Sequence, residues 1–281
     1  NRRFLSFSCN DYLNLTQHPA IKKAAIAAIE EFGAGSGASR LVTGNHPLYA
    51  RLEARLAEFK RTEAACVFGS GYLANTGIIP ALIGSDGLVL LDEFSHACIY
   101  AGAQLSRGHV KIFRHNDVGH ARALLDAHRT QHERALIVTD GVFSMDGDVA
   151  PLAELARLCA ARDALLVIDE AHAALGPEPQ RAGGPVLRVG TLSKMLGSAG
   201  GFVAGPGPLV DLIINRARSF IFTTAPAPAA AAAALAALRV LRSGEGDTLR
   251  ARLAALTSRV RPGHPSPIIP VVLGDESAAV A

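Results

Sequence analysis

Tryptophan is absent from this chain of 281 residues, and cysteine occurs only four times. The four cysteines lie far apart and form no CxxC pair, which argues against a metal site and against a disulfide framework. Reduced thiols in the cytoplasm are the simplest interpretation. The cysteines are Cys9, Cys66, Cys98 and Cys159.

Long apolar runs and runs of one charge are missing as well. The longest apolar stretch, 225–238, is mostly alanine with two prolines, so it is too short and too weakly hydrophobic to span a bilayer. No apolar signal core follows Arg2 and Arg3, and we therefore expect a cytoplasmic protein. The formal net charge is only +3, with no basic run for nucleic acid or an anionic membrane. The expected partner is a small molecule or a second copy of the chain.

The chain does contain a regular alternation of helical and strand patterns. Amphipathic periods predict helices over residues 18–32, 48–60 and 151–162. Continuous apolar runs are typical of strands in a parallel sheet that is covered on both faces. These runs are Leu88–Leu91, Ala135–Val138, Leu165–Ile168 and Val186–Val189. The alternation predicts an α/β fold with a mostly parallel sheet between helices.

The sequence changes character near Ser243. A charged helix is predicted over 245–260, three prolines follow, and a strand is predicted over 268–273. We interpret this region as the start of a small C-terminal α/β domain that is cut off at Ala281. The predicted divisions are an N-terminal segment (1–14), a large domain (15–243) and the beginning of the small domain (244–281).

Polar residues follow nearly every predicted strand. Parallel strands bring their carboxyl ends to one edge of the sheet, and open α/β sheets bind ligands at that edge. The polar groups are Asp92 with Ser95 and His96, residues 139–144, residues 169–172, and residues 190–194.

These residue types match the needs of pyridoxal 5′-phosphate (PLP), which requires a lysine, a carboxylate, hydrogen-bond donors and phosphate-binding amides. Lys194 lies among glycine and small residues, which let a bulky cofactor approach; the alternative is a surface lysine. Asp169 ends a buried strand, where a charged carboxylate is costly unless it meets a cation such as a protonated pyridine nitrogen. The alternative for Asp169 is a helix N-cap. His172 could donate to the 3′-oxygen.

Two glycine-containing stretches are weaker indications. Residues 70–75 follow the apolar run 65–68 and could place backbone amides against a phosphate at a helix start, although an ordinary strand-to-helix turn has the same pattern. The stretch 33–40 has no strand before it and is not a dinucleotide-binding fingerprint.

Eight stretches identify a family resemblance. They are FSCNDYLNL (7–15), SGYLAN (70–75), FSHAC (94–98), HND (115–117), GVFSMDGD (141–148), VIDEAH (167–172), TLSKMLGSAGGFVAG (191–205) and RSFIFTTAPAP (218–228). In this order they closely resemble the α-oxoamine synthases, most of all the members that act in biotin synthesis. The resemblance covers essentially the whole chain. The lysine motif and the GVFSMDGD stretch are specific to this family among PLP enzymes.

The resemblance implies a fold-type I PLP enzyme that works as a homodimer with shared active sites. Lys194 matches the lysine that forms the Schiff base, and Asp169 matches the partner of the pyridine nitrogen. His96 matches a histidine that stacks on the ring and could polarise the incoming carbonyl, while Ser144 and His172 match donors to the 3′-oxygen. The other matched positions are Gly71, Tyr72 and Thr191 at the cofactor, Thr223 reaching the phosphate from the other subunit, and Asn10 near the substrate carboxylate.

The implied reaction condenses L-alanine with a pimeloyl thioester, carried on coenzyme A or a carrier protein, and releases carbon dioxide and the free thiol. Reactions of the glycine C-acetyltransferase, 5-aminolevulinate synthase or serine palmitoyltransferase type remain open, as does a PLP-binding fragment without turnover. A hydrolase that uses Ser144, His172 and Asp169 is excluded because no GxSxG elbow surrounds Ser144.

Two departures from the family pattern stand out. Asn14 occupies a position where the family usually has glycine, and Tyr49 a position where histidine is common. The resemblance also implies a carboxylate-binding arginine in the C-terminal domain of the family, and this chain stops before the matching position.

Overall fold

The computed structural model describes residues 6–174, 184–274 and 277. The strands are β1 (Ala64–Phe68), β2 (Leu88–Asp92), β3 (His109–Phe113), β4 (Ala135–Asp140), β5 (Leu165–Asp169), β6 (Val186–Thr191) and β7 (Gly201–Gly205). The helices are α1 (Pro19–Phe32), α2 (Pro47–Lys60), α3 (Gly71–Leu82), α4 (Ala97–Ser106), α5 (Val118–His128), α6 (Leu152–Ala161), α7 (Gly207–Arg216), α8 (Arg218–Ile221), α9 (Pro228–Leu241) and α10 (Gly244–Val260). Two 3₁₀ turns are η1 (Leu15–Gln17) and η2 (Arg129–Gln131).

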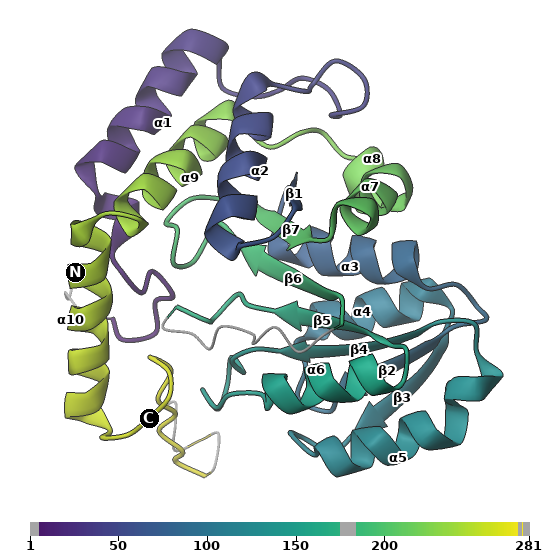
Figure 1. Cartoon of the computed structure of the whole chain (residues 1–281). Helices are drawn as coiled ribbons and strands as arrows, with labels where there is room; N and C mark the ends of the chain where they lie inside the picture. The colour runs from purple at the N-terminus through teal and green to yellow at the C-terminus, as the bar shows by residue number, and fades with distance from the viewer. Residues whose placement is uncertain (1–5, 175–183, 275–276, 278–281) are drawn as a thin grey trace.

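The strands form one sheet in the order β1-β7-β6-β5-β4-β2-β3 (Figure 1). The pairs β6–β5, β5–β4, β4–β2 and β2–β3 are parallel, whereas β7 runs antiparallel to both of its neighbours. The four strands predicted from continuous apolar runs are confirmed. They are β2, β4, β5 and β6, the four adjacent strands in the middle of the sheet.

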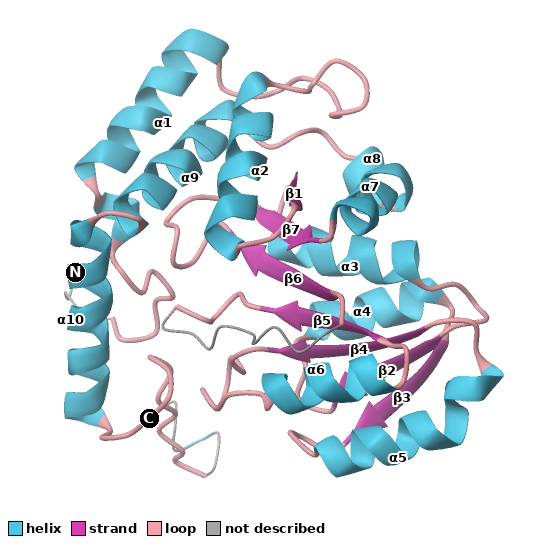
Figure 2. Ribbon diagram, in the orientation of Figure 1, coloured by secondary structure: helices cyan, strands magenta, loops and turns pink. Residues whose placement is uncertain are grey.

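Helices cover both faces of the sheet (Figure 2). Val89 and Leu91 of β2 belong to a core shared with α3, α4 and α7, whereas Leu88 and Leu90 belong to a core shared with α5 and α6. The helices α1, α2 and α9 pack together over β1 and β7 in a third apolar cluster. Each fully buried aliphatic side chain stabilises the fold by about 1.5–3 kcal/mol, so both faces of the central strands must be apolar.

The predicted helices are confirmed to within one or two residues at each end. His18 precedes α1, and its Nδ1 accepts a hydrogen bond from the amide of Ala20 at 3.2 Å. His46 caps α2 in the same way, accepting from the amide of Leu48 at 3.2 Å. The charged segment after Ser243 forms α10. Within the described residues, no helix combines the length and apolarity needed to cross a membrane.

The strand predicted over 268–273 is wrong. These residues pair with no strand of the described chain, and the side chains of Val271 and Val272 are exposed. Pro270 within the segment and Pro267 just before it have no amide hydrogen to donate to a ladder, which disfavours a strand here. The segment is instead held beside the loop after β4, where Ser266 Oγ donates to the carbonyl of Gly147 at 2.6 Å. The predicted domain divisions stay predictions, and Arg2 and Arg3 lie outside the described residues.

Asn14 adopts the left-handed conformation, with φ 55° and ψ 33°, immediately before η1. Glycine enters this region freely, and asparagine is the best tolerated of the other residues. Asp11 stabilises this turn, because its carboxylate accepts hydrogen bonds from the amides of Leu15 at 2.8 Å and Thr16 at 3.1 Å. The departure from the family glycine therefore preserves the backbone that the position requires.

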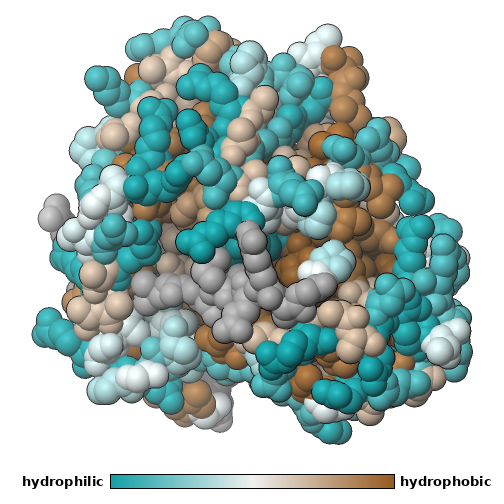
Figure 3. Space-filling model, in the orientation of Figure 1, coloured by the Kyte–Doolittle hydropathy of each residue, from teal (hydrophilic) through white to brown (hydrophobic). Residues whose placement is uncertain are grey.

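The surface is mostly polar on the face shown in Figure 3, with apolar patches between hydrophilic residues. Several large apolar side chains are well exposed on loops of the chain. They include Phe7, Leu41, Val42, Phe94, Met145 and Phe222.

Candidate active site

Carboxylates gather at one edge of the sheet. Asp92, Asp140 and Asp169 each end a buried strand, and all three side chains are buried. The register of β4 and β5 places Asp140 directly beside Asp169. This is the edge at which the sequence predicts a ligand site.

Asp169 lies at the centre of this group. Its Oδ2 accepts from Asn75 Nδ2 at 2.7 Å, and its Oδ1 accepts from the amide of Ala171 at 2.8 Å. Burial raises the pKa of Asp169, while these hydrogen bonds and the positive charges of Lys194 and His96 oppose the rise. No helix begins here, since residues 170–173 form a turn, so the N-cap alternative is wrong.

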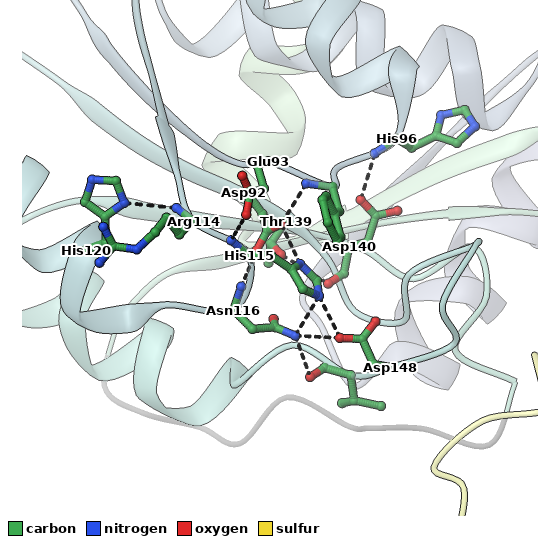
Figure 4. Close-up of polar contacts among 12 residues, drawn as sticks. Asp92, Glu93, His96, Arg114, His115, Asn116, His120, Thr139, Asp140 and Asp148 are labelled. Atoms are coloured by element: carbon green, nitrogen blue, oxygen red, sulfur yellow. Dashed lines mark hydrogen bonds and ion pairs between the residues drawn. The ribbon is translucent and has the colours of Figure 1, made fainter. Parts of the chain in front are cut away.

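Asp140 was not singled out in the sequence and belongs to the same site. Its Oδ2 accepts from the backbone amide of His96 at 3.0 Å (Figure 4). Burial and the neighbouring charge of Asp169 raise its pKa well above the usual range of a carboxyl. The hydrogen bond to Asp140 fixes the start of α4, where His96 Nδ1 accepts from the amide of Cys98 at 3.2 Å. The His96 side chain itself is exposed.

Lys194 lies in the loop between β6 and β7. Two backbone hydrogen bonds close this loop. The amide of Leu192 donates to the carbonyl of Gly200 at 2.9 Å, and the amide of Ser198 donates to the carbonyl of Leu192 at 2.8 Å. Gly197 has φ +58°, and a Cβ there would lie 2.6 Å from the amide nitrogen of Thr16, so only glycine fits. Burial lowers the pKa of Lys194, with Asp169, Asp140 and Cys98 opposing it. Its amine loses a proton more readily than that of a surface lysine, which favours nucleophilic chemistry.

His172 is buried, and its Nδ1 lies 2.6 Å from the hydroxyl of Tyr12. Burial, followed by the charges of Lys194 and His96, lowers the pKa of His172 to about 4. Burial raises the pKa of Tyr12 to about 12. A protonated hydroxyl beside a neutral imidazole donates to Nδ1, so the proton of His172 sits on Nε2. Tyr12 Oη also lies 3.3 Å from Asn10 Oδ1, which brings Asn10 to the same edge.

The start of α3 contributes backbone amides to this edge. Ser70 caps the helix, with its Oγ accepting from the amide of Leu73 at 3.1 Å. Gly71 and Tyr72 occupy the first turn, whose amides have no carbonyl partner within a helix. A Cβ on Gly71 would lie 3.5 Å from Thr191 Cβ, which places the end of β6 beside this helix start.

Among the described residues, Ser144 and Thr223 form no hydrogen bond with this group. Ser144 is half-buried in the turn after β4, two residues beyond the bridge between Val142 and Val149. Thr223 lies in the loop between α8 and α9, and its described hydrogen bond, to the carbonyl of Thr224 at 3.5 Å, stays within that loop. The structure therefore brings together Lys194, Asp169, His172 and His96, with Gly71, Tyr72, Thr191 and Asn10 beside them.

The donor set fits PLP. Among the described residues, Asp169 has two hydrogen-bond donors and no side-chain cation in an ion pair, so its buried charge calls for a cation such as a protonated pyridine nitrogen. A lysine with a lowered pKa, a histidine Nε2–H and the free amides of a helix start supply the other three requirements. Lys194 and Asp169 would hold the ring, and Gly71, Tyr72 and Thr191 the phosphate.

Sequence reasoning missed three residues of this site: Asp140, Asn75 and Tyr12. Asp140 carries a recognisable signal, because like Asp169 it is an aspartate that ends a buried strand. Asn75 is four residues after Gly71, which places both on one face of α3, but only the fold shows that this face meets Asp169. Tyr12 reaches His172 across 160 residues of sequence, a contact that no local pattern indicates.

Comparison with known proteins supports the same class. The family model described as aminotransferase class I and II matches residues 2–264. An 8-amino-7-oxononanoate synthase of Methylocella silvestris is 54% identical over 294 residues, covering 99% of this chain and 83% of that protein. The synthase of the same name from Beijerinckia indica is 51% identical, covering 100% and 75%.

Solved structures agree in fold. A serine palmitoyltransferase of S. paucimobilis with bound PLP and myriocin superimposes with a TM-score of 0.83 and 34% identity, covering 88% of this chain. The chain spans 64% of the length of that protein. An 8-amino-7-oxononanoate synthase of Francisella tularensis has a TM-score of 0.73 and 26% identity, covering 94% of this chain and 78% of that one.

The mostly parallel sheet, the lysine loop after β6 and the buried aspartate that ends β5 define the class of fold-type I PLP enzymes. The chain belongs to the class I and II aminotransferase family and, within it, to the α-oxoamine synthases.

Proposed function

We propose that the chain catalyses the decarboxylative condensation of L-alanine with a pimeloyl thioester to give 8-amino-7-oxononanoate, carbon dioxide and a free thiol, a step of biotin synthesis. The name shared by relatives that are 48–54% identical over nearly all of this chain is the observation that carries the proposal. Serine palmitoyltransferases, which match at 34–35% identity, supply the second candidate, with L-serine as the amino acid.

Lys194 is the proposed catalytic base. PLP, when bound, withdraws electrons from the substrate and so stabilises negative charge on its α-carbon. The lowered pKa of Lys194 eases loss of the proton from Nζ, which can then bond the cofactor aldehyde and later remove the α-proton of the amino acid.

Four residues tune the cofactor in this proposal. The carboxylate of Asp169 keeps a proton on the pyridine nitrogen and so maintains the ring as an electron-withdrawing group. Neutral His172 donates its Nε2–H to the 3′-oxygen, and Ser144 is proposed as the second donor. The exposed ring of His96 is proposed to stack on the cofactor face and to polarise the carbonyl of the incoming thioester.

The phosphate and the substrate carboxylate have separate proposed partners. The first-turn amides of Gly71 and Tyr72 face outward at the positive end of the α3 dipole, which favours a phosphate there. The hydroxyl of Thr191 adds a donor beside them. Asn10, linked through Tyr12 to His172, is proposed to contact the carboxylate of the amino acid.

We further propose a cytoplasmic homodimer in which Thr223 reaches the phosphate bound by the partner subunit. Exposed apolar side chains on two adjoining loops support a partner surface here. Leu41 and Val42 lie on one loop and Phe222 on the other, and the amide of Ala225 bonds to the carbonyl of Ala38 at 3.0 Å between them. Exposed apolar groups of this kind commonly mark protein contacts.

The visible absorbance of the purified protein with PLP tests the proposed function, measured before and after addition of L-alanine, glycine or L-serine. A yellow band that is lost in Lys194→Ala and changed most by L-alanine supports the proposal, together with release of free thiol from a pimeloyl thioester. A spectrum that responds chiefly to L-serine would favour the second candidate. A protein that takes up no PLP would overturn both.

A further inference from the structure

A partly buried polar network lies beside the candidate active site and uses none of its proposed catalytic residues. It consists of Asp92, His115, Asn116 and Asp148 (Figure 4). Asp92 ends β2, His115 and Asn116 follow β3, and Asp148 lies in the turn after β4. The network therefore joins three neighbouring strand ends.

His115 stands between two carboxylates. Its Nδ1 lies 2.8 Å from Asp92 Oδ1, and its Nε2 lies 2.7 Å from Asp148 Oδ2. A carboxylate accepts hydrogen bonds, so only the doubly protonated, positively charged ring donates to both at once. Although burial disfavours the charge, the hydrogen bonds with Asp92 and Asp148 raise the pKa of His115.

The ring of His115 also contacts two aromatic side chains. Phe94 stacks on it with a centroid distance of 4.4 Å, and Phe143 meets it edge-on at 4.4 Å. Phe94 lies two residues before His96, and Phe143 immediately precedes Ser144. One side chain thus touches both loops that carry proposed cofactor contacts.

The two aspartates that bond to the ring also bond to these loops. Asp92 accepts from the amides of Phe94 at 2.9 Å and Asn116 at 2.8 Å. The amide of Phe143 bonds to the carbonyl of Asp148 at 3.0 Å, and Asn116 Nδ2 donates to Asp148 Oδ2 at 2.8 Å. If His115 lost its charge, its ring would keep one N–H group and could donate to only one of Asp92 and Asp148. The link between the two loops would then be weaker.

We propose that His115 is a positioning residue, which in its charged form clamps the loop carrying His96 to the loop carrying Ser144. This inference rests on the proposed function, because those loops matter only if they contact the cofactor. The charged and titratable groups around His115 are Asp92 and Asp148, which bond to its ring, and Glu93, whose Oε1 accepts from its backbone amide at 2.7 Å. All three are acidic, so the surroundings favour the positive ring.

The test compares His115→Gln and Asp148→Asn with the parent protein, each loaded with PLP. Visible circular dichroism of the bound cofactor reports how firmly its ring is oriented, and turnover is measured as a function of pH. His132→Gln is the matched control, since His132 hydrogen-bonds to the carbonyl of Asp86 on an exposed loop away from the network.

We expect His115→Gln to bind PLP with a weakened circular dichroism band and to lose turnover by ~10-fold or more, because small misplacements of catalytic groups cost rates of this order. The parent should lose both the band and turnover as the pH rises through the pKa of His115. Asp148→Asn should move that loss to lower pH, since one favourable negative charge is gone. His132→Gln should match the parent.

Equal circular dichroism and an unchanged pH profile in folded His115→Gln would overturn the proposal. A loss of activity that only follows loss of folded protein, measured by far-ultraviolet circular dichroism, would also overturn it and leave a purely structural role. Because the cofactor band needs no turnover, a parent protein that binds PLP but does not condense L-alanine would refute the proposed reaction while the test of His115 stands.

Discussion

At the scale of single residues, His172 shows how burial selects a protonation state. Its imidazole is held neutral by burial, with its Nδ1 accepting from Tyr12 and its Nε2–H left for a ligand oxygen. A solvent-exposed histidine would be partly charged near its ordinary pKa of about 6.5 and would lose this defined tautomer.

The pH dependence of stability follows from the same environment. The pKa of His172 is about 4 in the folded state and lies near 6.5 when unfolded, so the unfolded chain binds the proton first as pH falls. The free energy of unfolding should therefore decrease between pH 6.5 and 4, with a contribution from His172 of about 3 kcal/mol. This contribution is absent above pH 6.5 and complete below pH 4. Urea unfolding at a series of pH values measures it.

His172→Gln is the matched variant, because glutamine keeps a hydrogen-bonding partner for Tyr12 but does not titrate. Its stability should fall less than that of the parent over the same pH range. Parallel curves for the two proteins would show that His172 does not titrate as expected.

At the scale of secondary structure elements, a buried ion network ties α2 to the sheet. Glu170, in the turn after β5, lies with its carboxylate 2.7 Å from Lys60 Nζ and 2.6 Å from Arg188 Nε. Each of the three side chains is at most 8% exposed. Arg188 also donates to the carbonyl of Lys60 at 2.9 Å. The network holds the backbone that immediately follows Asp169.

We expect Glu170→Gln to lower the free energy of unfolding by about 3–5 kcal/mol, because it removes the buried carboxylate that forms ion pairs with Lys60 and Arg188. Glu58→Gln is the control, since Glu58 pairs with Arg55 and Arg242 at the surface, where solvent screens the charges. Denaturant titration of both variants gives the comparison. Equal stability of Glu170→Gln and the parent would contradict a role for the network in holding these elements.

The turn before η1 makes a second prediction at this scale. Asn14 is exposed and left-handed, so a substitution there alters backbone strain rather than packing. Asn14→Gly should be at least as stable as the parent, whereas Asn14→Val should lose about 1–2 kcal/mol, since a β-branched residue is poorly tolerated at positive φ. Thermal unfolding of the two variants measures the difference. A stable Asn14→Val would mean that the turn can rearrange.

At the scale of the whole molecule, the proposed dimer predicts a measurable mass. Light scattering after size-exclusion chromatography should give twice the chain mass of 29.3 kDa. Val42 is 75% exposed on the proposed contact surface, so Val42→Asp should shift the protein toward the monomer by burying a charge at the interface. Val260→Asp is the control, because Val260 is 72% exposed at the end of α10. A monomeric parent at every concentration would refute the dimer.

Much of the fold was predictable because it depends on local patterns. The four central strands are continuous apolar runs, which a sheet buried on both faces demands, and α1, α2 and α6 follow the helical period. Strands β3 and β7 were harder to recognise. Strand β3 is largely exposed and β7 contains two glycines, so neither has the continuous apolar pattern.

The segment 268–273 shows the limit of that reasoning. Its apolar residues suggest a strand, but a strand also needs a partner with free hydrogen-bonding groups. Strand pairing joins residues far apart in the chain, so a local pattern cannot supply this condition.

The residues of the site divide in the same way, into those that the sequence predicts and those that only the fold brings together. Lys194, Asp169, His172 and His96 were recognisable from residue type, from their position after strands and from the family motifs. The neighbouring residues that set the protonation of these side chains could not be recognised from the sequence. Three contacts form only when the chain folds: the hydrogen bond from Asn75 to Asp169, the hydrogen bond between Tyr12 and His172, and the strand pairing that places Asp140 beside Asp169. Chemical identity is local to each residue, whereas desolvation and charge coupling depend on distances that tertiary packing alone sets.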